Sequence, residues 1–124
     1  MTLNENKGVT LNDYQKQARQ TAAYPVDHSP VYAELGTLSY LMLGLCSEAG
    51  ECASKVKKAL RDTGGVLSES AREALLDELG DVLWYVAEAA SALGESLDDV
   101  AYRNVAKLVS RAERGTLHGD GDTR

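Results

Sequence analysis

The chain has 124 residues, of which 44% are hydrophobic and 26% charged, and its formal net charge is -6 at pH 7. This length predicts one domain with a modest core, to which self-association would add buried surface. The acidic balance argues against a general nucleic-acid binder, because non-specific affinity for the phosphate backbone comes from excess Lys and Arg.

The sequence carries no signal for membrane insertion or export. It has no uninterrupted apolar stretch of about 18 residues, which a spanning helix needs, and no charged-then-apolar leader. We therefore predict a cytoplasmic protein that has neither a membrane partner nor a nucleic-acid partner.

The first 30 residues predict one short helix. Residues 1–9 are polar, which predicts a flexible N-terminus. Thr10 has the side chain of an N-cap, with Asp13 three residues later, and predicts a helix that runs to about Ala23. Two prolines within residues 24–30 then predict a loop.

Two long amphipathic helices are predicted next. Apolar residues recur at helical spacing over about residues 38–60, and the glycine pair at 64–65 stops this helix. Ser68 or Ser70 can cap a second helix, whose apolar stripe ends at Gly94.

The last part of the chain predicts one more helix and a tail. Ser96, with Asp99 three residues later, resembles a capping box and opens a helix with its own apolar stripe. The Gly-rich residues 115–124 predict a flexible C-terminal tail, and no segment has a convincing strand pattern. The sequence therefore predicts an all-α fold, a helical bundle of four main helices that forms a single domain over residues 1–124.

Two acidic pairs lie on the two long helices. Glu48 and Glu51 are three residues apart, as are Glu78 and Asp81, and this spacing places both carboxylates of a pair on one helix face. Each pair lies on the same rotational side of its apolar stripe. The short connection favours antiparallel packing of the two helices, which would bring the two acidic flanks together.

Four carboxylates in one place repel each other unless a cation relieves the repulsion. Ligation by oxygen alone suits Mg²⁺ or Mn²⁺. A di-iron bundle site would need Glu-x-x-His pairs, but the third residues after the glutamates are Glu51 and Asp81, which disfavours iron. The alternative without metal is that Lys55 and Lys58 neutralise the acids as salt bridges.

Several segments together resemble a known family. They are residues 43–51 (LGLCSEAGE), 55–58 (KVKK), 77–85 (DELGDVLWY) and 104–116. They are similar to MazG-type all-α nucleoside triphosphate pyrophosphohydrolases, and the resemblance spans about residues 36–124. The chain departs from the family at Ser47, where longer members often have a further Glu.

The resemblance implies hydrolysis of nucleoside triphosphates between the α and β phosphates, which yields a nucleoside monophosphate and pyrophosphate. It implies Mg²⁺, with Mn²⁺ as a substitute, bound by Glu48, Glu51, Glu78 and Asp81. Glu48 or Glu51 is the expected base that helps to deprotonate water. The family also implies a homodimer or a dimer of dimers, and a role in sanitising the nucleotide pool.

Further residues are candidates for substrate binding. Position and resemblance suggest that four cations hold the polyphosphate: Lys55, Lys58, Lys107 and Arg111. Asn104 lies inside an apolar stripe, where its amide needs a partner such as a sugar hydroxyl or a ligand carboxylate. Trp84 and Tyr85 could stack on a base, or pack in the core or at a dimer interface.

Two rival functions remain at this point, because fold alone does not determine function. One is a deoxynucleotide-specific hydrolase of the all-α dUTPase or dCTPase kind, which differs only in selectivity. The other is a non-catalytic, metal-stabilised helical module for protein interaction.

Overall fold

The computed structural model describes residues 8–24 and 33–116, and within these ranges the chain is all-α. The described elements are four helices: α1 (Leu11–Gln20), α2 (Ala33–Asp62), α3 (Glu69–Ala92) and α4 (Leu97–Glu113). The predicted fold class is confirmed. None of the described helices is both long and apolar enough to cross a bilayer.

The helices begin at three of the predicted caps. The hydroxyl oxygens of Thr10, Ser68 and Ser96 each accept a hydrogen bond from the backbone N–H three residues later, at 3.1, 3.2 and 3.1 Å. Each bond satisfies one of the N–H groups that a helix start leaves without a partner. Ser68, and not Ser70, is therefore the cap of α3.

The helix α2 begins five residues before the predicted start at Leu38. Gly36 lowers the helix propensity of this first turn, but a long helix that is already packed can extend through one glycine at a cost of about 1 kcal/mol. Most of the loop predicted over residues 24–30, most of the predicted flexible N-terminus and most of the predicted C-terminal tail lie outside the described residues.

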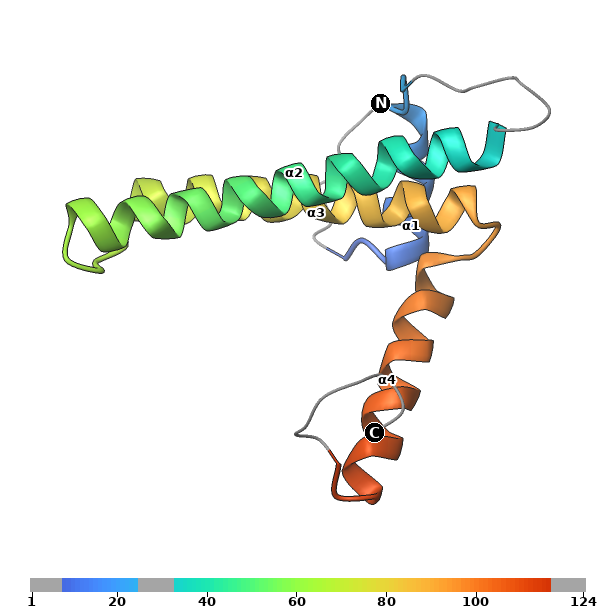
Figure 1. The fold of residues 1–124 in the computed structure, drawn as a ribbon. Helices are drawn as coiled ribbons and strands as arrows, with labels where there is room; N and C mark the ends of the chain where they lie inside the picture. The colour runs from blue at the N-terminus through green and yellow to red at the C-terminus, as the bar shows by residue number, and fades with distance from the viewer. Residues whose placement is uncertain (1–7, 25–32, 117–124) are drawn as a thin grey trace.

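The helices α2 and α3 form an antiparallel hairpin (Figure 1). Gly64 and Gly65 turn the chain with φ angles of 63° and 84°, which residues with a Cβ rarely adopt. The N–H of Gly65 donates to the carbonyl oxygen of Ala59 at 3.0 Å, and the hydroxyl of Thr63 donates to that of Val66 at 2.6 Å. The glycine pair therefore stops α2 as predicted.

The buried core lies where α1 and α4 meet α3. Ala18, Ala87 and Leu97 are buried together, and Tyr14 and Trp84 pack against them. This cluster stabilises the junction of the helices. Because it is small and rich in alanine, it leaves much of the hairpin uncovered.

The helix α4 extends away from the hairpin (Figure 1) and packs against α1 and α3 alone among the described helices. Two side chains of α1 hold its first turn. The backbone N–H of Leu97 donates to Oε1 of Gln15 at 2.8 Å, and that of Asp98 donates to Oδ1 of Asn12 at 3.1 Å. The helix α1 thus fixes where α4 starts.

Candidate metal centre

Three carboxylates from the two helices of the hairpin converge. Glu48 lies on α2, and Glu78 and Asp81 lie on α3. One oxygen atom from each lies within 4.8 Å of the other two. Glu48 and Glu78 are partly buried and Asp81 is exposed, so the group forms an acidic edge of the hairpin that water can reach.

The pKa of Glu48 shows that this clustering of carboxylates is electrostatically unfavourable. Partial burial raises the pKa of the Glu48 carboxyl above its usual range, and the negative charges of Asp81, Glu78 and Glu51 raise it further. Both effects favour the neutral acid over the carboxylate. A divalent cation would relieve the same repulsion by pairing with the carboxylates.

Glu51, the fourth predicted acid, is exposed one helical turn after Glu48. Its oxygens are not part of the group of three, although its charge acts on Glu48. Its role as a ligand or base stays a prediction.

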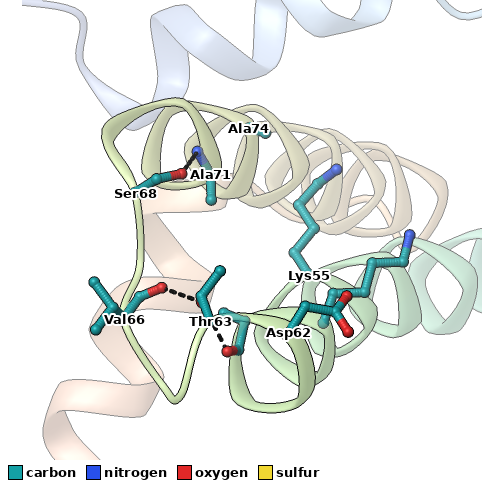
Figure 2. Close-up of a pocket in the computed structure, with 9 residues that line it drawn as sticks. Lys55, Asp62, Thr63, Val66, Ser68, Ala71 and Ala74 are labelled. Carbon is teal, nitrogen blue, oxygen red and sulfur yellow. Dashed lines mark hydrogen bonds between the residues drawn. The ribbon is translucent and has the colours of Figure 1, made fainter.

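One of the predicted cations, Lys55, lies beside the acids. Nζ of Lys55 lies 3.0 Å from Oε1 of Glu78, with both side chains partly buried. This ion pair is the neutralisation that the metal-free alternative expects. Lys55 and Lys58 also line a hollow of about 300 Å³ between the end of α2 and the start of α3 (Figure 2).

Figure 2 shows what surrounds these cations. Lys55 and Asp62 come from α2, and Ser68, Ala71 and Ala74 from the α3 side, with Thr63 and Val66 in the turn between them. The hollow therefore lies between the two helices near the turn of the hairpin, and Lys55, which pairs with Glu78, is one of its lining residues.

A second hollow, of about 350 Å³, lies on the other side of the acids and is lined by Glu48, Asp81, Trp84 and Tyr85. The two aromatic rings meet edge to face, with centroids 5.0 Å apart. This arrangement places an aromatic surface and two carboxylates in one open cavity.

Gly44 lies on α2 where this helix approaches the ring of Tyr85 on α3. Its missing side chain leaves room for the ring of Tyr85, which occupies the position that a Cβ at residue 44 would take. The space beside the acids is therefore filled by an aromatic ring that borders the second hollow.

The predicted residues of α4 do not reach the acidic group within one chain. Asn104 and Lys107 are exposed, and Arg111 is buried with 7% of its surface exposed. The described residues of α4 make no packing contact with α2, which carries Glu48. Their roles in substrate binding stay predictions.

Residues near the site that the sequence pattern missed come from the first part of the chain. The hydroxyl of Tyr14 on α1 donates to the carbonyl oxygen of Gly80 at 3.4 Å. Burial raises the pKa of the Tyr14 hydroxyl, and the charge of Asp81 raises it further. Tyr14 lies more than 60 positions before Gly80 in the sequence, and no spacing signal could link its helix to the acids.

The chain is similar to a known protein family and to a phage protein. The model of the MazG nucleotide pyrophosphohydrolase domain family matches residues 36–116. The chain is also 48% identical over 111 residues to a protein of Mycobacterium phage L5 called Gene 37 protein, and the match covers 90% of this chain and 96% of the phage protein. No solved structure matches the chain significantly.

Proposed function

Because this chain belongs to the MazG nucleotide pyrophosphohydrolase family, we propose that it hydrolyses nucleoside triphosphates to nucleoside monophosphates and pyrophosphate. The substrates would be ribo- or deoxynucleoside triphosphates of the cytoplasmic pool. The reaction would remove unwanted nucleotides from that pool. The observation that carries the proposal is the convergence of Glu48, Glu78 and Asp81 beside an aromatic hollow.

The donor atoms at this edge fit Mg²⁺, or Mn²⁺ in its place. All three groups offer carboxylate oxygens, which hard divalent cations prefer, and the exposed side of the group leaves room for water and phosphate. Glu48, Glu78 and Asp81 would hold the ion, with Glu51 as a fourth ligand. Such an ion neutralises phosphate charge and makes the attacking water more acidic.

The positions of the remaining side chains suggest their roles in substrate binding and proton transfer. Lys55 would exchange Glu78 for a phosphate oxygen when the acids bind metal, and Lys58 would bind the polyphosphate in the same hollow. Glu48 or Glu51 would accept the proton of the attacking water.

The second hollow would receive the nucleoside. Trp84 and Tyr85 border it next to Glu48 and Asp81, so a base stacked on either ring would have its phosphates near the acids. This placement supports the substrate-binding role predicted for the two aromatic residues.

We propose that the active form is a homodimer or a dimer of dimers. Within one chain α4 points away from the hairpin, so the exposed Asn104 and Lys107 would reach a polyphosphate only at the site of a second copy. Arg111 is buried, and it would take part only if assembly uncovered its side chain. The exposed apolar residues of the hairpin and of α4 supply surface for such an assembly.

The experiment that tests the activity is an incubation with Mg²⁺ and a panel of ribo- and deoxynucleoside triphosphates, followed by ion-exchange chromatography of the products. We expect monophosphate and pyrophosphate in equal amounts. Diphosphate with orthophosphate would contradict the proposed bond cleavage. Turnover restricted to one deoxynucleotide would identify the dUTPase or dCTPase kind of selectivity.

The metal-stabilised interaction module is the second candidate, favoured by the exposed apolar surface of the described helices. The substitutions Glu48→Gln and Asp81→Asn separate the two functions. Each should abolish turnover while the helix content stays unchanged. The matched control is Glu73→Gln, because Glu73 is an exposed residue of α3 outside the acidic group and its substitution should leave turnover unchanged. No turnover by the unaltered chain would favour the interaction module.

A further inference from the structure

Trp84 is held by a residue from a distant part of the chain. Its indole Nε1–H donates to Oγ1 of Thr21 at 2.8 Å, across 63 positions of sequence. Thr21 is the residue that ends α1, and it lies outside residues 36–116, the part of the chain that matches the family model. The contact therefore joins the first helix to one wall of the aromatic hollow.

The hydroxyl of Thr21 is oriented for this contact. It donates its own proton to the carbonyl oxygen of Ala18 at 2.7 Å. A hydroxyl has one donor and two acceptor positions, so the lone pairs of Oγ1 remain for the indole N–H. The two bonds fix the direction from which Trp84 is held.

A second set of contacts surrounds the same ring. Tyr24 meets Trp84 edge to face at 6.2 Å between centroids and stacks on Tyr40 at 5.7 Å. Its hydroxyl donates to Oε2 of Glu88 at 3.0 Å, and Nη1 of Arg19 donates to the same oxygen at 2.8 Å. Because Glu88 is fully buried, these bonds anchor residues 19–24 to α3.

We propose that Thr21 is a positioning residue, which orients the indole of Trp84 as the face on which the nucleobase of the substrate stacks. The inference rests on the proposed function, and it makes α1 part of the machinery that selects the substrate. A ring that is already held in its binding orientation loses less freedom when a ligand stacks on it. Removal of the Thr21 hydroxyl should therefore weaken binding of the base and leave the chemistry at the acids unchanged.

Trp84 is the only tryptophan of the chain, so its fluorescence reports this site directly. The experiment compares the unaltered chain with Thr21→Val, which keeps the shape of the side chain without its hydroxyl, and Thr21→Ser, which keeps the hydroxyl. Each protein is titrated with a non-hydrolysable α,β-methylene nucleoside triphosphate in Mg²⁺, and with inorganic tripolyphosphate as a ligand without a base.

We expect Thr21→Val to shift the Trp84 emission and to raise the dissociation constant for the nucleotide about fivefold, the size expected for one lost hydrogen bond. KM should rise by the same factor with kcat within about twofold, and Thr21→Ser should restore both. Tripolyphosphate should bind all three proteins equally. Circular dichroism should show the same helix content for each.

The inference is overturned if Thr21→Val leaves the emission and nucleotide affinity unchanged, or if it weakens tripolyphosphate equally. A complete lack of nucleotide response in the unaltered chain also overturns it. The proposed function fails separately: nucleotide binding that depends on Thr21, without any turnover, would support the positioning role and refute the hydrolase. Turnover that does not depend on Thr21 would refute the positioning role alone.

Discussion

The carboxyl group of Glu48 lies partly out of water and close to other acids, and both effects raise its pKa. Helical spacing predicts this neighbourhood, because the i, i+3 pairs and the antiparallel turn follow from local sequence. It does not predict which acids touch. Glu51 shares the flank of Glu48 but remains exposed one turn away, and the ion pair of Glu78 depends on how the Lys55 side chain crosses between the helices.

The raised pKa gives a prediction for the metal-free protein. A carboxyl group whose pKa is higher in the folded chain binds its proton more tightly there, so its favourable contribution to stability is present at low pH and is lost as the pH rises through the folded pKa. Glu48→Gln removes a charge that is unfavourable at neutral pH. Its melting temperature in chelator should exceed that of the unaltered chain at about pH 8, and the difference should shrink toward about pH 5.

Thermal unfolding followed by circular dichroism at several pH values measures this difference. Glu73→Gln should show no such pattern, because Glu73 is exposed and outside the acidic group. Mg²⁺ should raise the melting temperature of the unaltered chain and have little effect on Glu48→Gln, because a ligand stabilises only the folded state that binds it. A lower melting temperature for Glu48→Gln at pH 8 would refute the electrostatic account.

The elements differ in how far the sequence could predict them. The hairpin of α2 and α3 follows from local signals: the apolar periodicity, the cap at Ser68 and the glycine pair that turns the chain. The placement of α1 and α4 does not. It depends on single hydrogen bonds such as those from Leu97 to Gln15 and from Trp84 to Thr21, which join positions more than 60 residues apart and leave no periodic pattern.

The close approach of the two hairpin helices gives a second prediction. A Cβ at position 44 would collide with the ring of Tyr85, so Gly44→Ala should displace that ring or separate the helices, at a cost of about 1–3 kcal/mol. Gly50 lies on the same helix with open space around it. Gly50→Ala should therefore stabilise the chain by about 0.5–1 kcal/mol, the usual gain of Ala over Gly in a helix interior.

Urea unfolding of both variants measures the two free energies of unfolding. Because Tyr85 borders the aromatic hollow, Gly44→Ala should also weaken nucleotide binding, whereas Gly50→Ala should not. If both alanines stabilised the chain equally, the ring of Tyr85 would not depend on the missing side chain at position 44.

Within residues 8–24 and 33–116, the molecule buries little apolar surface. Of the six apolar residues that are buried in the described part of the chain, four are alanines. In contrast, Leu76, Leu79 and Leu83 form one row along α3 with exposed fractions of 55%, 50% and 37%. The sequence predicts the apolar stripes but not this outcome, because periodicity cannot say whether a stripe is covered by the same chain or by another.

A similar row lies on α4, where Val105, Leu108 and Val109 are 56%, 44% and 51% exposed. Two such rows on separate helices expose more apolar surface than a small monomer usually does. Exposed apolar surface of this kind is typical of a protein interface. A second copy of the chain would cover both rows, which agrees with the proposed homodimer. It also agrees with the proposal that residues of α4 bind the polyphosphate at the site of a second copy.

This assembly is open to a direct test. We expect light scattering after size-exclusion chromatography to give two or four times the chain mass of 13.3 kDa. Leu79→Lys and Leu108→Lys each place a charge in an apolar row, and both should shift the mass toward the monomer because burying an unpaired ammonium is costly. Gln20→Lys adds the same charge at an exposed position of α1 and should leave the mass unchanged.

The activity of these variants then shows whether assembly matters for the site. If α4 of one copy supplies cations to the acids of the other, turnover should fall in proportion to the lost dimer and recover at high protein concentration, because association is restored by mass action. A fully active chain of monomer mass would refute this arrangement. It would require Lys55 and Lys58 to bind the polyphosphate without help from α4.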